Sequence, residues 1–370
     1  MNKLIYRFNN NRQSIFNSKD ILGGKGANLA QMAKLGLPVP PGFTITTKVC
    51  EYFYSNKKKI PKKVIQQTKK EIRIIEKISK KEFGGLSNPL LVSVRSGSRV
   101  SMPGMMDTIL NLGLNDKTVL GLKNKTGNGR FAKDSYRRLI QMYGNVVLGI
   151  EPHFFEELIE NYKLTKGVIQ DTELEEEDWD GLIQNFKDVI KTKTKKIFPQ
   201  DVNEQLWGSI HAVFLSWNSK RAKTYRKINF IPDHWGTAVN VQAMVFGNMG
   251  NDCATGVGFT RNPSTGKKEI FGEYLVNAQG EDVVAGTRTP KDLLHPNKSM
   301  SKIFQQLKKI FYKLENKYRD MQDIEFTVEN NKLWMLQTRS GKRTAKAAIK
   351  IAVDMVKEKL ISKKEAILRI

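Results

Sequence analysis

The sequence predicts an α+β protein, and three observations lead to that prediction. Short strand patterns follow one another at residues 238–246, 256–261 and 269–275. A helix pattern near residues 299–319 leads into two alternating runs, 323–329 and 333–339. Consecutive strands of this kind form an antiparallel sheet, and the helix would pack on that sheet.

The composition is that of a globular protein. At 370 residues with 39% hydrophobic content, the chain can build two or three structural units. Cys50 and Cys253 are too few for a disulfide framework or a cysteine-based zinc site. The N-terminus lacks the pattern of a secretory signal, and no apolar run approaches the roughly 20 residues that span a bilayer. We therefore expect a cytoplasmic protein with no membrane segment.

The formal net charge is +25, which raises the question of nucleic-acid binding. The excess is mostly Lys in clusters such as 57–59 and 191–196, without the interleaved aromatic residues of a single-strand binder. A solvated lysine surface is therefore the favoured interpretation. Attraction of a polyanionic ligand stays open, and nucleic acid is the weaker alternative.

The first third of the chain contains two candidate anion contacts. After a predicted strand at 4–8, a glycine-rich turn places Lys25 at the start of a helix that ends near Gly36. Exposed N–H groups and the helix dipole favour an anion at such a turn, although its spacing is not that of a P-loop. A predicted buried strand at 90–98 carries Arg95, which needs a carboxylate or a phosphate as partner.

Between these two sites we predict a strand at 43–46 and an exposed helix within 57–82, whose Ile72, Ile75 and Ile78 would face the core. Residues 101–114 form a Gly- and Met-rich loop with Asp107 and Thr108, either a bare loop or a lid over phosphates.

The middle and the end of the chain are predicted to be mostly helical, apart from the sheet. Residues 114–199 read as a helical segment, and a further helix spans about 202–226. Residues 277–286 read as a loop. After the hairpin, two amphipathic helices end the chain, and Ser362 with Glu365 fits a capping box for the second.

The hairpin within 321–339 concentrates chemistry on one face. With a three-residue loop at 330–332, Asp323 would face Arg339 and Glu325 would face Gln337. The opposite face would then be apolar. A two-residue loop would slip the pairing by one and mix the faces, so the hydrophobic pattern favours the three-residue loop. The apolar face would consist of Ile324, Phe326, Val328, Trp334 and Leu336.

Carboxylate and amide oxygens beside one guanidinium suit Mg²⁺ with bound phosphates, because hard oxygens hold the metal and the arginine neutralises the charge of the phosphates. An edge hairpin with a merely solvated polar face is the alternative for this stretch.

Motifs along nearly the whole chain together resemble the N-terminal, ATP-grasp-type nucleotide-binding domain of the pyruvate, phosphate dikinase family. The motifs are Gly-Gly-Lys-Gly-Ala-Asn-Leu-Ala at 23–30, Leu-Pro-Val-Pro-Pro-Gly-Phe at 37–43, Ser-Val-Arg-Ser-Gly-Ser at 93–98, Pro-Gly-Met-Met-Asp-Thr-Ile-Leu-Asn-Leu-Gly at 103–113, Trp-Gly-Thr-Ala-Val-Asn-Val-Gln at 235–242, Thr-Arg-Asn-Pro-Ser-Thr-Gly at 260–266, Gly-Glu-Tyr-Leu-Val-Asn-Ala-Gln-Gly-Glu-Asp-Val-Val-Ala-Gly at 272–286 and Leu-Gln-Thr-Arg at 336–339. Related enzymes that make phosphoenolpyruvate with water share the Lys25, Arg95 and Gln337 regions, whereas the Pro-Gly-Met-Met-Asp-Thr segment resembles the phosphate dikinase family more closely.

The resemblance implies a two-lobed ATP-grasp fold that binds ATP between its lobes with Mg²⁺, and passes the βγ-phosphates to a histidine on a separate domain. It implies a small lobe at 1–113 with 200–236, a helical subdomain at 114–199, a sheet lobe at 237–340 and a linker at 341–370. The implied phosphate contacts are Lys25 and Arg95, and Arg339 would stabilise the transferring charge. Asp323, Glu325 and Gln337 would hold Mg²⁺ or position the triphosphate, while Gln242, Met244, Val245, Glu281 and Asp282 would lie at the adenine side.

The sequence also departs from the family pattern. None of His153, His211, His234 and His295 has the Thr-Ser-His-Ala neighbours of the family's phosphohistidine, and we expect the acceptor domain and the pyruvate barrel to lie outside these 370 residues. We expect this chain to bind Mg-ATP as a monomer without completing the dikinase reaction. The alternatives are a phosphoenolpyruvate synthase-like domain, or a catalytically silent basic binding protein with an ATP-grasp shape.

Overall fold

The computed structural model describes residues 3–8, 18–286, 288–296 and 300–370. The chain divides into two compact units, which are described separately. Unit 1 consists of residues 1–30 and 41–244, and unit 2 consists of residues 31–40 and 245–370. Each unit has a five-stranded antiparallel sheet within the described residues and helices besides, which confirms the predicted α+β class.

The sheet of unit 1 has the strand order β1-β2-β5-β3-β4. Its strands are β1 (Ile5–Arg7), β2 (Gly42–Ile45), β3 (Val92–Gly97), β4 (Thr108–Leu112) and β5 (Ala238–Ala243). Two predictions were wrong here. The strand predicted at 238–246 pairs with β2 and β3 instead of joining the sheet of the strands that follow it. The predicted loop at 101–114 ends in β4, because Ile109 and Leu112 are buried against β3.

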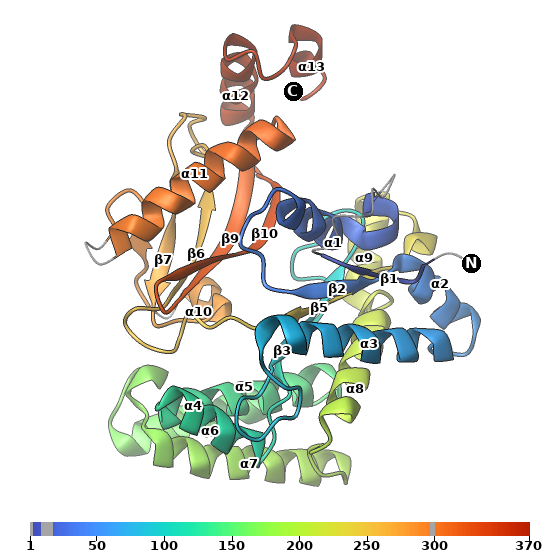
Figure 1. Cartoon of the computed structure of the whole chain (residues 1–370), viewed down its shortest axis with the longest axis vertical. Coiled ribbons are helices and arrows are strands. Elements are labelled where there is room, and N and C mark those ends of the chain that lie inside the picture. The colour runs from blue at the N-terminus through green and yellow to red at the C-terminus, as the bar shows by residue number, and fades with distance from the viewer. Residues whose placement is uncertain (1–2, 9–17, 287, 297–299) are drawn as a thin grey trace. The chain divides into compact units, whose positions relative to one another are not determined.

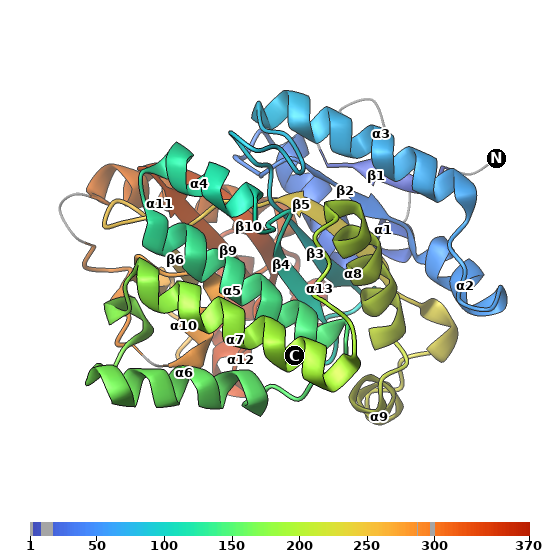
Figure 2. The same cartoon turned by 90° about the horizontal axis from the view of Figure 1, so that it is seen from below.

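Helices account for most of unit 1. They are α1 (Ser18–Lys34), α2 (Thr47–Ser55), α3 (Lys62–Ser79), α4 (Thr118–Thr126), α5 (Gly129–Val146), α6 (His153–Lys166), α7 (Glu176–Thr194), α8 (Val202–Ser216) and α9 (Lys220–Ile228), with short 3₁₀ turns at Asp171–Glu173 and Asp233–Trp235. Helices α4 to α7 form the predicted helical segment, in which α5 packs against both α4 and α7 (Figure 2).

Two helix predictions for unit 1 need correction. The helix predicted at 202–226 breaks after Ser216, and α9 starts anew because the Ser219 hydroxyl accepts a hydrogen bond from the Ala222 N–H at 3.3 Å. In α3, Ile72 and Ile75 are buried as predicted, whereas Ile78 is 51% exposed near the end of the helix.

Unit 2 is built on a sheet with the strand order β10-β9-β6-β7-β8. The strands are β6 (Ala254–Phe259), β7 (Phe271–Val276), β8 (Lys291–Asp292), β9 (Gln322–Glu329) and β10 (Lys332–Ser340). Helix α11 (Ser301–Tyr318) crosses this sheet and buries Phe304, Leu307 and Phe311, as expected for an α+β layer (Figure 1). Its predicted start at residue 299 lies outside the described residues.

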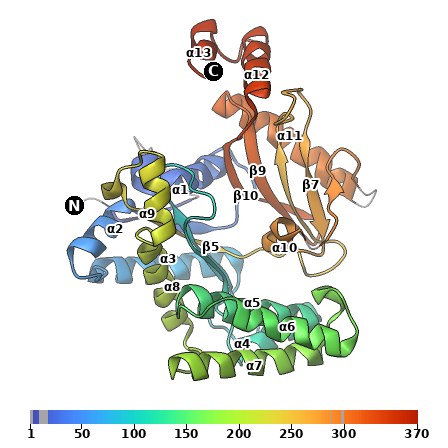
Figure 3. The same cartoon turned by 180° about the vertical axis from the view of Figure 1, so that it is seen from behind.

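The predicted loop at 277–286 contains a short helix, α10 (Gly280–Ala285), which lies against β6 and β7 (Figure 3). The Asp282 carboxylate caps this helix by accepting a hydrogen bond from the Gln279 N–H at 2.8 Å.

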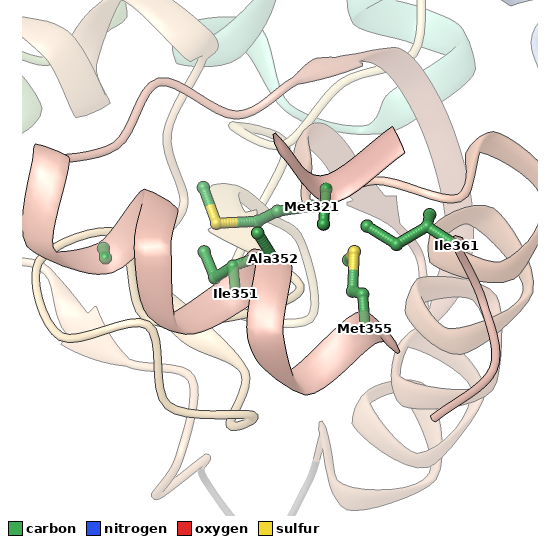
Figure 4. Close-up of a cluster of buried hydrophobic side chains, with 7 residues drawn as sticks. Met321, Ile351, Ala352, Met355 and Ile361 are labelled. Carbon is green, nitrogen blue, oxygen red and sulfur yellow. The ribbon is translucent and has the colours of Figure 1, made fainter. Parts of the chain in front are cut away.

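Two helices, α12 (Ala345–Lys357) and α13 (Lys363–Ile367), end the chain as predicted. The Ser362 hydroxyl caps α13 by accepting a hydrogen bond from the Glu365 N–H at 3.1 Å. Buried side chains of both helices, including Ile351 and Met355, gather around Met321 at the start of the hairpin (Figure 4). Within the described residues, no helix is long and apolar enough to cross a membrane.

Candidate nucleotide and metal site

The hairpin of β9 and β10 has the predicted pairing, but it reaches that pairing differently. Asp323 faces Arg339 and Glu325 faces Gln337. The loop is a two-residue turn, since Lys332 already pairs with Glu329, and Asn330 and Asn331 have φ of 48° and 59° as a type I′ turn requires. A bulge between Met335 and Gln337 then inserts one extra residue. The predicted three-residue loop was therefore wrong, although the register beyond the bulge is the same.

The bulge changes which residues of β10 are buried. Ile324, Phe326 and Val328 of β9 are buried as predicted. In β10, however, Leu333 and Met335 are buried, while the predicted Trp334 and Leu336 are only half-buried. The bulge shifts the alternation of core-facing and outward-facing residues in β10 by one position. The prediction assumed one unbroken alternation along the strand and therefore placed these residues on the wrong face.

Four polar side chains, Asp323, Glu325, Gln337 and Arg339, form what we call the site face of the hairpin. The Arg339 Nε donates a hydrogen bond to the Asp323 carboxylate at 2.7 Å, and the Gln337 amide donates to the Glu325 carboxylate at 2.8 Å. Asp323 and Gln337 are 8% and 7% exposed. Two carboxylates, one amide and one guanidinium therefore converge on adjacent strands.

The electrostatics of the site face favour the uptake of a cation. Burial raises the pKa of Asp323, the nearby Glu325 charge raises it further, and Arg339 opposes both effects. A carboxylate whose charge is only partly compensated gains from a positive ion beside it. The site face thus holds more negative charge than its one arginine offsets.

The donor chemistry of the site face fits Mg²⁺. Asp323 and Glu325 offer carboxylate oxygens, and Gln337 offers an amide oxygen, all of which are hard ligands. The described residues contain no cluster of three or more His, Cys, Asp or Glu side chains suited to a metal. A magnesium ion here would accordingly use the amide, water or ligand oxygens beside the two carboxylates.

In unit 1, the glycine-rich turn that carries Lys25 lies against the end of β3. Helix α1 is interrupted at Gly23, whose φ of 67° and ψ of 171° are not helical, so Lys25 stands at the start of the second helical segment. A Cβ on Gly23 would lie 1.8 Å from the carbonyl oxygen of Gly97, so only glycine fits. The Gly24 N–H donates to the carbonyl oxygen of Ser98 at 2.7 Å.

Arg95 lies on β3 at the same end, where its cross-strand neighbours are Asn240 on β5 and Thr108 on β4. The structure thereby brings the Lys25 turn, Arg95 and Thr108 into one region of unit 1. Arg95 is half-buried, as a guanidinium with a role at a surface site would be.

Asp107, by contrast, has a partner that the sequence did not suggest. Its carboxylate pairs with Arg221 of α9, and its N–H donates to the Ser216 hydroxyl at 3.4 Å. Burial raises the pKa of Asp107, and Arg221 opposes that shift. Arg221 lies 114 residues away in the chain, within a basic helix, and no local pattern marks it.

The remaining candidates occupy separate places. Gln242 is buried in the middle of the unit 1 sheet, paired with Ser93 and Gly42. Met244 and Val245 follow the end of β5, on either side of the division between the units. In unit 2, Glu281 is exposed in α10 and Asp282 caps the same helix, which gives Asp282 a structural role.

Comparison with known proteins shows what this chain is similar to. The profile of the family described as pyruvate phosphate dikinase, AMP/ATP-binding domain, matches residues 19–82, 56–304 and 298–360. Pyruvate, phosphate dikinase of Rhizobium meliloti (strain 1021) is 55% identical over the whole chain, which covers 43% of that relative. The Clostridium symbiosum enzyme of the same name is 53% identical, again over the whole chain and 42% of the relative.

A plant relative gives the same result. Pyruvate, phosphate dikinase, chloroplastic, of Flaveria pringlei is 54% identical over 95% of this chain and 37% of the relative. The chain thus spans about two fifths of the length of the curated relatives that it matches.

Proposed function

Because the chain belongs to the family described as pyruvate phosphate dikinase, AMP/ATP-binding domain, we propose that it binds Mg-ATP and is the phosphoryl-donating part of a pyruvate, phosphate dikinase. The observation that carries the proposal is the site face, where Asp323 with Arg339 and Glu325 with Gln337 stand as neighbouring cross-strand pairs. This face combines ligands for a hard cation with a cation for phosphate.

The finer description of the fold is part of the proposal. We propose an ATP-grasp-like arrangement in which helices α4 to α7 form an inserted subdomain, the sheet of β6 to β10 forms the sheet lobe without β5 of the predicted 237–340, and residues 341–370 lead toward a histidine-bearing domain. The two antiparallel sheets and the helical segment support this proposal.

Each candidate residue then has a chemical task. Lys25, at a helix start, and Arg95, at a strand end, would neutralise phosphate oxygens. Asp323, Glu325 and Gln337 would hold Mg²⁺, which supplies positive charge to the phosphate oxygens when bound. Arg339 would stabilise the charge of the phosphoryl group during transfer, after exchanging part of its contact with Asp323 for the phosphate.

The remaining candidates would orient the nucleotide. Thr108 would offer a hydroxyl beside Arg95, and Asp107 would keep the preceding loop in place through its pair with Arg221. Gln242, Met244, Val245, Glu281 and Asp282 are proposed at the adenine side.

The overall reaction would convert ATP, pyruvate and phosphate to AMP, phosphoenolpyruvate and diphosphate. The βγ-phosphates would pass to a histidine on a separate domain with release of AMP; inorganic phosphate would remove the γ group as diphosphate, and the histidine would pass the remaining phosphoryl group to pyruvate. We expect none of the four histidines here to be that acceptor. His211, for example, packs on Phe53 at 5.3 Å between ring centroids.

Two predictions about context stay predictions. We expect the chain to be a monomer without its partner domains. The cytoplasmic location is also untested, and one relative is named as chloroplastic. A phosphoenolpyruvate synthase-like domain, in which water replaces phosphate, remains the alternative enzyme.

Calorimetric titration tests the proposal. Mg-ATP should bind the parent chain, and the double variant Glu325→Ala, Gln337→Ala should bind it about tenfold more weakly or worse, because two polar groups that hold the metal are lost. The matched control is Glu176→Ala, which removes a half-buried ion pair with Lys123 in the helical segment. Equal binding by parent and double variant would refute the role of the site face, and no binding by a folded parent would refute the function proposed for this chain.

Transfer is tested by adding a histidine domain from a pyruvate, phosphate dikinase together with [β-³²P]ATP. Label on the added domain supports phosphoryl donation. ATP binding without label would leave a silent nucleotide-binding protein.

A further inference from the structure

The base of the hairpin carries a second set of polar contacts, on the face opposite to the site face. The Thr338 hydroxyl donates a hydrogen bond to the side-chain oxygen of Gln322 at 2.9 Å. These side chains are 0% and 1% exposed, so the bond is made in the interior of unit 2. The Gln322 amide nitrogen donates to the carbonyl oxygen of Asp320 at 3.0 Å, so the side chain is held at both ends.

From Gln322 the contacts continue to Thr260, which directly follows strand β6, and to helix α11. The Gln322 N–H donates to the Thr260 hydroxyl at 3.0 Å, and that hydroxyl donates to the Glu315 carboxylate at 2.6 Å. Glu315 is 2% exposed. One hydroxyl therefore connects the start of the hairpin to a buried carboxylate on α11.

Arg261 extends the set to Glu358, the C-cap residue of helix α12. Its Nε and Nη2 donate to the Glu315 carboxylate at distances of 2.8 to 3.2 Å, and Nη2 also donates to the Glu358 carboxylate at 2.8 Å. Arg261 is fully buried, and among the described residues its Nη1 has no hydrogen-bond partner. Glu358 also accepts a hydrogen bond from Lys268 at 2.7 Å.

We call five of these residues, Thr338, Gln322, Thr260, Glu315 and Arg261, the buried polar chain; it ends at Glu358, whose side chain is 25% exposed. A buried ion pair of this kind gives little stability in itself, because desolvation cancels much of the attraction and well-packed apolar residues often do as well. Hydrogen-bonded networks do, however, fix geometry, since each member restricts the rotamer of the next. The buried polar chain is therefore better suited to fixing the positions of side chains than to stabilising the fold.

Strand geometry connects the buried polar chain to the site face. Gln322 directly precedes Asp323, and Thr338 lies between Gln337 and Arg339. Because successive side chains of a strand point to opposite faces, fixing Gln322 and Thr338 on one face also fixes the backbone that carries Asp323, Gln337 and Arg339 on the other.

We propose that the buried polar chain positions the site face, so that Thr338, Gln322, Thr260, Glu315 and Arg261 are positioning residues for the binding of Mg-ATP. The proposal rests on the function proposed above. It assigns these residues a role through Asp323, Gln337 and Arg339, with no contact to the nucleotide of their own.

The test is the isosteric variant Thr338→Val, which removes the hydroxyl and keeps the shape. Its affinity for Mg-ATP, measured by calorimetry, should fall about tenfold, the size of effect seen when groups that orient metal ligands are lost. Thr338→Ser restores the hydroxyl and should stay within about twofold of the parent.

The matched control is Thr255→Val in the same sheet. Thr255 is 5% exposed and its hydroxyl bonds to that of Thr327 at 3.3 Å, so the same chemical change removes a buried bond on β6, which β9 separates from the strand of Thr338. Thr255→Val should lower the unfolding temperature without the loss of affinity. Both variants are titrated at a temperature where circular dichroism shows them folded.

A measurement without nucleotide reports on the positioning directly. The Nε–H of Arg339, bonded to Asp323 at 2.7 Å, should exchange with water faster in Thr338→Val than in the parent or in Thr255→Val, as followed by NMR.

The outcomes separate the two proposals. If the parent binds Mg-ATP and Glu325→Ala, Gln337→Ala weakens it, but Thr338→Val behaves as Thr255→Val in affinity and exchange, the positioning role is overturned alone. If the folded parent does not bind Mg-ATP, the proposed function fails and the positioning role fails with it. Loss of affinity and faster exchange in Thr338→Val, with rescue by Thr338→Ser, support the positioning role.

Discussion

Two buried aspartates, Asp134 in the helical segment and Asp323 on the hairpin, both lie beside arginines, yet their pKa values are shifted in opposite directions. Asp134 accepts hydrogen bonds from Arg137 and Arg138 at 3.0 to 3.2 Å. Burial alone would raise the pKa of Asp134, but its arginine neighbours outweigh burial and lower it. Asp323 has one arginine, and there burial raises the pKa.

The difference separates a structural ion cluster from a candidate site. Around Asp134 the charges are satisfied among themselves, and Arg137 also bonds Asp171 at 3.0 Å and stacks on Trp179. The site face has two carboxylates and one guanidinium, that of Arg339, which bonds the Asp323 carboxylate and whose side chain is 37% exposed. The carboxylates of the site face can still bind a cation, and the accessible arginine can bind an anionic ligand.

The largest expected effect concerns the structural cluster. Asp134→Ala leaves two arginines buried without that carboxylate, so the free energy of unfolding should fall by about 3–5 kcal/mol in urea denaturation. If the variant remains folded, its affinity for Mg-ATP should be that of the parent. If Asp134→Ala were as stable as the parent, the conclusion that Asp134 belongs to a structural ion cluster would be wrong.

Substitution of the aspartate on the hairpin should instead affect the affinity for Mg-ATP and leave the stability intact. Asp323→Asn removes a charge that burial disfavours and keeps a hydrogen-bond acceptor for Arg339, so stability at pH 7 should be unchanged or higher. Affinity for Mg-ATP should nevertheless fall by about tenfold, since a metal ligand loses its charge. Loss of stability with full affinity would make Asp323 a structural residue like Asp134.

The pH dependence should also differ in sign. The lowered pKa of Asp134 gives stability that is present above its unfolded value of 3.8 and is lost as the pH falls through the folded pKa. The raised pKa of Asp323 acts oppositely, because stability is lost as the pH rises from 3.8 through its folded pKa. Carboxyl-carbon NMR titration should place the Asp323 midpoint above 3.8 and the Asp134 midpoint below it; the reverse order would contradict the electrostatic comparison.

An exposed ion pair sets the lower end of the scale. Lys350 and Asp354 of α12 are paired at 2.7 Å with side chains 45% and 22% exposed. Lys350→Ala should change the free energy of unfolding by less than about 0.5 kcal/mol and leave Mg-ATP binding unaffected. A larger change would mean that burial does not decide how much the ion pairs of Asp134, Asp323 and Asp354 each contribute to stability.

The pairs of the site face were predictable because they depend on alternation and register alone. Asp323 with Arg339 and Glu325 with Gln337 follow from two alternating runs and a net offset of three residues. A two-residue turn with one bulged residue has the same net offset as a three-residue loop, so the sequence could not distinguish them, and Trp334 and Leu336 were assigned to the wrong side.

Other features depend on contacts that no local pattern encodes. The membership of β5 in the unit 1 sheet, the pair of Asp107 with Arg221, and the burial of Arg261 beside Glu315 all join segments far apart in the chain. The roles of the site residues stay predictions, since the structure places the side chains and binding experiments must assign their tasks.

The most direct test of the account is the Mg²⁺ dependence of ATP binding in Glu325→Gln, which keeps the size of the side chain and an acceptor for Gln337 but removes the charge. We predict that calorimetry will show Mg-ATP binding about tenfold weaker than in the parent, and metal-free ATP binding in EDTA equal or tighter, because a negative charge that repels phosphate is gone. An equal loss with and without Mg²⁺, or no loss in either case, would contradict the assignment of the hairpin as a magnesium and phosphate site.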